Sequence, residues 1–85
     1  MDTVFLGSIV LLPFNFVPAG FHACDGTLLS IAENAALYSL VGTAFGGDGR
    51  TTFALPDLNK KDNPVLQDGK LKYCIALEGM YPSRN

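Results

Sequence analysis

A single segment, Gly42–Leu58 (GTAFGGDGRTTFALPDL), concentrates glycines, aspartates, an arginine and a proline between an apolar run and the second half of the chain. Glycine-rich loops bind phosphates when their amides point inward and a helix N-terminus follows them. Here the helical pattern ends before the loop begins, and the phosphate-binding pattern G-x-x-x-x-G-K-[ST] is absent. We therefore expect the segment to turn the chain from a helix into an extended segment, with Asp48 and Arg50 exposed at the loop tip.

A non-catalytic anion site is the alternative that the same loop leaves open. Arg50 precedes the hydroxyls of Thr51 and Thr52, and a guanidinium beside a hydroxyl pair suits a phosphate or a carboxylate. Asp48 and Gly49 complete this candidate ligand-binding set. A calcium site at Asp25, Asp48 and Asp57 would need about six to eight oxygen ligands gathered in one place, whereas turn formation explains Asp48, which stands between glycines, without any metal. We therefore expect neither a metal site nor a cofactor.

One helix is predicted immediately before the loop. Ser30 and Glu33 match the S-x-x-E capping box, in which the serine hydroxyl accepts the amide hydrogen of the glutamate while the carboxylate reaches back. The segment Ile31–Val41 continues with alanines and leucines, which favour a helix of about eleven residues. Gly42 follows at the position where a left-handed C-terminal cap is expected.

Extended segments are predicted on both sides of this helix. Val4–Leu12, a run rich in Val, Ile and Leu, fits a strand buried on both faces. The pair Asp25-Gly26 indicates a tight turn, so we expect a small hairpin with arms at Phe21–Cys24 and Thr27–Leu29. Further strand patterns cover Thr51–Leu55 and Leu71–Leu77, and a polar connection covers Asn59–Gly69.

The order of these elements predicts an α+β fold: a small single domain with a few strands, one central helix and long irregular loops. At 85 residues the chain is one domain at most. It is 48% apolar and only 16% charged, while a domain of this size buries only about 60–65% of the surface that its unfolded chain exposes. The apolar surplus predicts that part of the surface faces another chain, in a homo-oligomer.

The N-terminal apolar run does not predict a membrane anchor. Val4–Leu12 is far shorter than the roughly 20 residues that span a bilayer. Pro13 and Pro18 interrupt the segment after the run, and we expect Phe14 and Phe16 to pack from this loop onto the core. No lysine or arginine precedes the run, so the basic segment of a signal peptide is missing. We expect no membrane partner and synthesis in the cytoplasm.

Charge and the reactive side chains exclude further classes of function. A net charge of −2, with only six lysines and arginines, argues against binding to a nucleic acid polymer. Cys24 and Cys74 lack CxxC spacing and are expected to be free, buried thiols. His22 is the only histidine, which leaves no Ser–His–Asp set, and a metal held by three copies of His22 about a trimer axis is the weaker alternative. We expect no enzyme activity.

Short motifs follow one another in a specific order along the chain: the strand from Phe5, Pro18-Ala19-Gly20-Phe21, Cys24-Asp25-Gly26, the helix, Gly42-Thr43, Gly46-Gly47-Asp48-Gly49, Thr52-Phe53 and Leu55-Pro56-Asp57-Leu58. In this order they resemble the phage tail-collar domain family, and the ending YCIALEGMYPSRN is similar to that of its microcystin-dependent-type members. The family usually has a tryptophan where Phe21 stands and often a tyrosine at Phe45. The resemblance covers about four-fifths of the chain.

The resemblance implies a non-enzymatic structural module of a phage tail fibre or collar, typically a homotrimer in contact with other tail components. Made in the host cytoplasm, it would be carried in a virion or a phage-tail-like particle. The single domain 1–85 would comprise a collar motif at 1–58, a polar connection at 59–70, and a C-terminal strand and tail at 71–85.

An alternative function follows from the same resemblance. Family members generally continue after the Leu-Pro-Asp-Leu motif with a long glycine-rich region that carries much of the receptor contact, whereas Asn59–Lys70 stands in its place here. The chain could then be a stand-alone oligomer with the collar fold. In that role it would bind or sequester a small anionic ligand, for example a host signal nucleotide, at the loop or in an intersubunit pocket.

Overall fold

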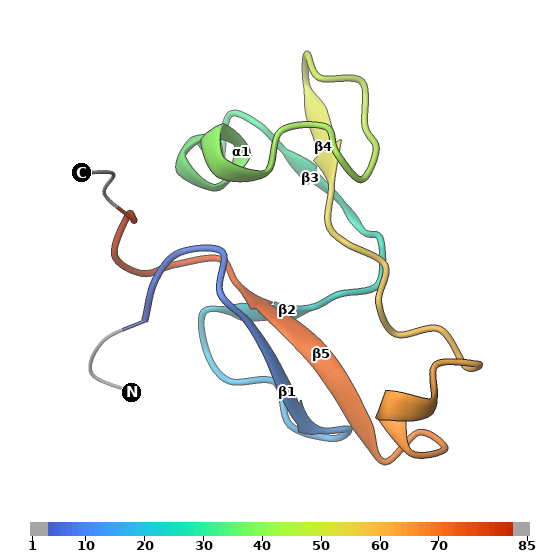
Figure 1. Ribbon diagram of the computed structural model, residues 1–85. Coiled ribbons are helices and arrows are strands. Elements are labelled where there is room, and N and C mark those ends of the chain that lie inside the picture. The colour runs from blue at the N-terminus through green and yellow to red at the C-terminus, as the bar shows by residue number, and fades with distance from the viewer. Residues whose placement is uncertain (1–3, 83–85) are drawn as a thin grey trace.

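The computed structural model describes residues 4–82 and confirms the α+β class. Two small antiparallel sheets and one α-helix make up the fold (Figure 1). The elements are β1 (Ile9–Pro13), β2 (Phe21–Ala23), β3 (Leu28–Ser30), α1 (Ala35–Val41), β4 (Thr52–Ala54), the 3-10 helix η1 (Pro64–Leu66) and β5 (Leu71–Ala76).

The first sheet has its last strand in the middle. Its order is β1-β5-β2, and both outer strands run antiparallel to β5. Ile9 lies opposite Ile75 on one side, and Ala23 lies opposite Cys74 on the other. The sheet therefore joins segments from the two ends of the sequence, as the central position of β5 in Figure 1 shows.

The second sheet pairs β3 with β4, and α1 lies beside it (Figure 1). Leu29 lies opposite Phe53, and the ladder continues where the Leu55 amide donates to the Thr27 carbonyl at 2.9 Å. The predicted hairpin between residues 21–24 and 27–29 is thus wrong, because its two arms belong to different sheets. The chain passes from one sheet to the other at Asp25, which forms an isolated bridge with Asp57.

One hydrophobic core connects the helix and both sheets. Six buried residues form its centre, and each is at most 7% exposed. They are Leu6, Cys24, Leu37, Phe53, Leu55 and Ile75. Around them pack partly buried side chains such as Tyr38, whose ring centroid lies 5.4 Å from that of Phe53. Both cysteines are free and buried, as predicted.

The helix is shorter than predicted at its N-terminus. The Ser30 hydroxyl does accept the Glu33 amide hydrogen, at 3.3 Å. However, residues 31–33 form a turn, and α1 begins at Ala35. The Ile31 amide donates to the Thr51 carbonyl at 3.0 Å, which keeps residue 31 in the β3–β4 ladder. The extended ladder therefore prevails over helix propensity in this segment.

The helix ends where the sequence predicts. The Gly42 amide donates to the Tyr38 carbonyl at 2.7 Å, and Gly42 has a φ of 60° with a ψ of −147°. The positive φ is the conformation that favours glycine, although this ψ lies outside the left-handed helical region that we expected.

The N-terminal strand is shorter and more exposed than predicted. It begins at Ile9 rather than Val4, and its odd-numbered residues face outward while its even-numbered residues are partly buried. Phe14 and Phe16, expected in the core, are 53% and 54% exposed. Within residues 4–82 no second layer covers this outer face of the first sheet, so burial on both faces is impossible there.

Candidate functional site

The glycine-rich loop between α1 and β4 folds back tightly onto β4. At the point where the loop lies closest to β4, only glycine fits. Gly47 has a φ of 94°, and a Cβ built there would lie 2.4 Å from the Phe53 Cα. No side chain fits at that distance, so the loop lies directly against β4. The Gly46 carbonyl accepts the Ala54 amide hydrogen at 3.0 Å, which covers the outer edge of β4.

The Asp48 carboxylate organises the loop tip. Its Oδ1 accepts the amide hydrogens of Arg50, Thr51 and Thr52 at 2.8, 2.8 and 3.0 Å. Its Oδ2 accepts the Thr51 hydroxyl at 3.0 Å. These bonds, those to the backbone amides first, hold the pKa of Asp48 well below its ordinary value. The structural role that we predicted for this aspartate therefore fits its geometry.

The five candidate ligand-binding residues do lie together, yet they bond mainly to one another. Besides the three amides that bond to Asp48, the Gly49 amide donates to the Thr52 carbonyl at 3.0 Å. The Thr52 hydroxyl accepts the Asp48 amide hydrogen at 3.3 Å. The exposed Arg50 side chain remains as a donor for an external anion, which would have to approach the negative charge of Asp48.

Asp25 and Asp57, which we considered as calcium ligands, instead close the crossing between the two sheets. The Asp25 carboxylate accepts both the amide and the hydroxyl hydrogen of Thr27. These bonds, the hydroxyl bond first, lower the pKa of Asp25. Among residues 4–82, no group of three His, Cys, Asp or Glu side chains is placed to hold a metal ion.

His22 and Cys24 stand two residues apart in the sequence, but they lack the properties of a catalytic pair. Cys24 is fully buried, and burial, with a smaller contribution from Cys74, raises its thiol pKa to about 11. A nucleophilic cysteine instead needs a depressed pKa and access to substrate. The His22 Nδ1 lies 2.8 Å from the Ala23 carbonyl oxygen and 4.0 Å from an Asp25 carboxylate oxygen, and so it faces backbone and solvent.

A mixed-charge groove is a feature that sequence analysis missed. It has a volume of about 700 Å³ and lies between η1 and the first sheet. Lys72 is placed on its wall with Nζ 5.0 Å from the centroid of the Phe14 ring, and Lys61, Asp25 and Asp68 also line it. No local pattern predicts this groove, because it exists only once residues 59–70 fold back onto β5. Its charges are of both signs and do not select an anion.

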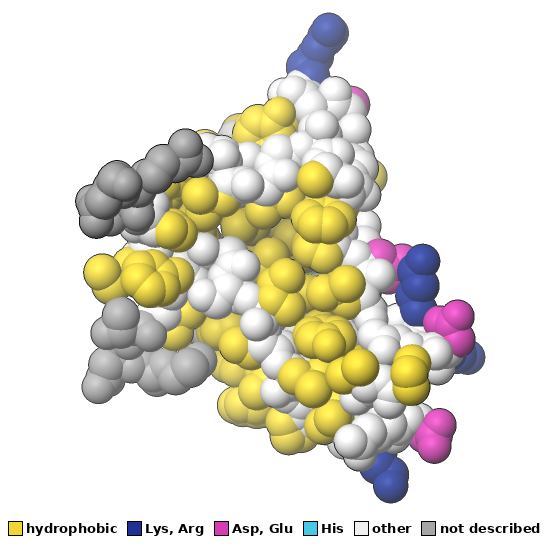
Figure 2. Space-filling model, viewed as in Figure 1, with side chains coloured by type: hydrophobic (Ala, Val, Ile, Leu, Met, Phe, Trp, Pro, Cys, Tyr) yellow, Lys and Arg dark blue, Asp and Glu magenta, His cyan; other side chains and the backbone are white. Residues whose placement is uncertain are grey.

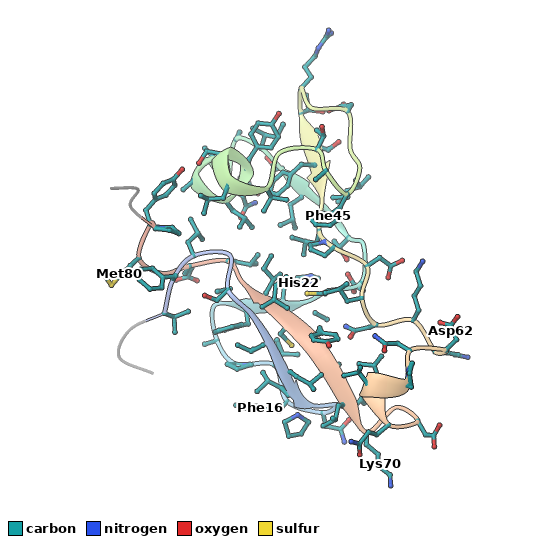
Figure 3. The ribbon with its side chains drawn as sticks, viewed as in Figure 1. Phe16, His22, Phe45, Asp62, Lys70 and Met80 are labelled. Carbon is teal, nitrogen blue, oxygen red and sulfur yellow. The ribbon has the colours of Figure 1, made fainter. Side chains whose placement is uncertain are left out.

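Exposed apolar side chains are the most extensive surface feature. Figure 2 shows hydrophobic side chains spread across the face that carries β1, with charged groups at the periphery. In Figure 3, Met80 lies beyond one end of the first sheet, whereas Phe16 and Lys70 lie toward the other. The large hydrophobic residues that are at least 40% exposed are Phe5, Ile9, Leu11, Phe14, Phe16, Val17, Leu28, Leu40, Phe45, Val65, Met80 and Tyr81. In the described part of the chain, no helix has the length and apolar character needed to cross a membrane.

Comparison with known proteins identifies the family. The family model described as Phage Tail Collar Domain matches residues 7–62, which span β1, β2, β3, α1, the glycine-rich loop and β4. No curated protein and no solved structure matches the chain. The match covers more than half of the sequence and contains the motifs from Pro18 to Leu58 that we singled out. The chain therefore belongs to the phage tail collar domain family.

Proposed function

We propose that this protein is a structural component of a phage tail, carried in the virion, and that it assembles with copies of itself as a trimer. Family membership supports the tail role, since collar domains are in general structural parts rather than enzymes. The buried, high-pKa thiol of Cys24 is in keeping with a role without catalysis.

Self-association is supported by the amount of surface that the chain exposes. Its accessible surface is 5687 Å² at a mass of 9.1 kDa. A folded monomer of that mass is expected to expose about 4900 Å². The chain therefore exposes more surface than an average monomer of its mass. The radius of gyration, 13.1 Å, also exceeds the roughly 12 Å of a compact domain of this length.

The composition of that surface supports the same proposal. A typical monomer's largest apolar patch is about 300–600 Å², and larger exposed patches mark interaction sites. Here half-exposed aromatic side chains such as Phe14, Phe16 and Phe45 add to aliphatic ones across several elements. Aromatic residues are enriched at interfaces, where they contribute much of the binding energy.

The test is the mass of the purified protein in solution. Size-exclusion chromatography with light scattering, repeated over a range of micromolar concentrations, should give about three times 9.1 kDa or a whole multiple of that trimer mass. A monomer mass at every concentration would contradict self-association. The tail role is tested separately, by detecting the chain in purified particles with a specific antibody.

A further inference from the structure

Strand β1 leaves one of its edges without hydrogen-bond partners. Its register with β5 is fixed at the two ends, where the Phe14 amide donates to the Lys70 carbonyl and the Ala76 amide donates to the Ser8 carbonyl, both at 2.9 Å. Even-numbered residues of β1 therefore bond to β5. Backbone groups alternate sides along a strand, so Ile9 turns its N–H and C=O away from the sheet, and Leu11 does the same.

Nothing within residues 4–82 bonds to these outward groups of Ile9 and Leu11. The free stretch is also bounded at both ends. The Gly7 amide donates to the Ala76 carbonyl, and the Pro13 carbonyl accepts the Phe16 amide hydrogen at 3.0 Å. Proline has no N–H of its own. The open edge of β1 thus consists of two amides and two carbonyls.

The opposite edge of the same sheet is partly occupied. On β2, the Phe21 amide donates to the Pro18 carbonyl, and the Ala23 carbonyl accepts the Asp25 amide hydrogen and contacts the His22 ring nitrogen. A strand arriving at β2 would find these groups in use. Between the two edges of the first sheet, the one on β1 is ready to extend it.

The open part of β1, from Ile9 to Leu12, carries no charged side chain, and Pro13 is the one protective residue at its end. Exposed edge strands normally bear charged residues, especially lysine, to prevent pairing with other chains. From Ile9 to Val17 the sequence has no charged residue, and Ile9 and Leu11 are 44% and 40% exposed. Two such edges brought together place no like charges in contact, and each offers the N–H and C=O groups of Ile9 and Leu11 to the other. A second copy of this chain therefore fits the edge.

We infer that β1 pairs antiparallel with β1 of a second copy about a two-fold axis at Val10, so that Ile9 of each copy lies opposite Leu11 of the other. This register uses every free group of both edges, in four N–H···O=C hydrogen bonds. It joins two three-stranded sheets into one of six strands. The inference rests on the proposed self-association and adds a two-fold contact to it.

A two-fold contact also restricts the number of copies in the assembly. By itself it gives a dimer, and combined with a threefold contact it gives a hexamer. A trimer alone would satisfy the proposed function but not this pairing. The measured mass therefore separates failure of the inference from failure of the proposed function.

Amide hydrogen exchange tests the pairing directly, by NMR at two protein concentrations on either side of the association midpoint. The amides of Ile9 and Leu11 should exchange at least about tenfold more slowly at the higher concentration. The amides of Val10 and Leu12, which bond to β5, are the internal control and should stay protected at both. Equal exchange of Ile9 and Leu11 at both concentrations would overturn the pairing.

Two double variants test the register with matched changes. The variant I9K/L11K places lysines opposite each other in the pair, and it should halve the mass of the dimer or hexamer. The variant I9K/L11E carries charges at the same two positions but places Lys opposite Glu in each pair. It should remain the same dimer or hexamer as the wild type.

Three results would count against the inference. Dissociation of both double variants alike would overturn the strand register, since a merely apolar contact loses affinity with either change. A wild-type trimer unaffected by I9K/L11K would overturn the inference and keep the proposed function. A wild-type monomer would overturn both. Thermal unfolding of each variant shows that the fold is retained.

Discussion

The side chain of Asn59 pairs with the backbone of Tyr73 as a strand would. Its Oδ1 accepts the Tyr73 amide hydrogen at 2.7 Å, and its Nδ2 donates to the Tyr73 carbonyl at 3.0 Å. β2 has ended at this level, so a single amide side chain continues the sheet alongside β5. This contact attaches the polar connection, predicted as an exposed segment, to the first sheet.

We expect Asn59→Ala to destabilise the fold by about 1–3 kcal/mol, because it leaves the partly buried Tyr73 amide without a partner. Chemical denaturation measures the change. Asn15→Ala is the matched control, since Asn15 is exposed and makes no side-chain hydrogen bond within residues 4–82. Equal stability of the two variants would mean that water replaces the Asn59 side chain without cost.

Gly47→Ala should destabilise the protein by at least about 2 kcal/mol, since the new Cβ meets the Phe53 backbone and the positive φ adds strain. Gly69→Ala is the control. Gly69 has a similar φ of 85° but open space around its Cα, so this change should cost only about 1 kcal/mol. If the two variants unfold at the same denaturant concentration, the close approach of the loop to β4 is wrong.

Acid should destabilise the protein partly through Asp48. Its folded-state pKa is lowered, so its contribution to stability is complete above the unfolded pKa of about 3.9 and is lost as the pH falls through the folded pKa. Asp48→Asn cannot make this charge-dependent contribution. We expect its melting temperature to fall less steeply than that of the wild type between about pH 5 and about pH 2.

The control for the acid experiment is Asp62→Asn, which replaces an exposed aspartate outside the loop. It should keep the pH dependence of the wild type. Parallel curves for the wild type and Asp48→Asn would contradict the role given to the carboxylate.

Arg50→Ala tests the anion-binding alternative. The side chain is exposed, so we expect the free energy of unfolding to change by about 0–1 kcal/mol. Calorimetric titration of both proteins with nucleotides and sugar acids should give no heat if the loop is structural. Binding by the wild type that Arg50→Ala weakens strongly would instead establish a ligand site at the loop.

Local signals predicted the features that depend on neighbouring residues. The helix end at Gly42 and the turn at Asp48 both follow from the chemistry of a few adjacent positions, and both are present. The fold class followed from the order of such segments. The family followed from the motif order between Pro18 and Leu58, which the family model also covers.

Features decided by distant residues could not be predicted in this way. Asp25-Gly26 resembles a hairpin turn, yet Asp25 pairs with Asp57, and the chain continues into β3, which pairs with β4 rather than with β2. Ile31 has helix-forming neighbours, but its amide bonds to Thr51. The mixed-charge groove likewise depends on contacts across the sequence. Hydrophobic periodicity and secondary-structure propensity carry no information about which distant segments pair with each other.

The central position of β5 has a consequence for how the chain folds during synthesis. β1 and β2 are made early, but neither has a partner in the first sheet until residues 71–76 have left the ribosome. Loop closure over so many residues is slow, and unpaired apolar strands are prone to aggregate while they wait. The nascent protein therefore exposes the Ile9–Val17 segment until residues 71–76 have been made, which makes this segment a natural point of contact for chaperones.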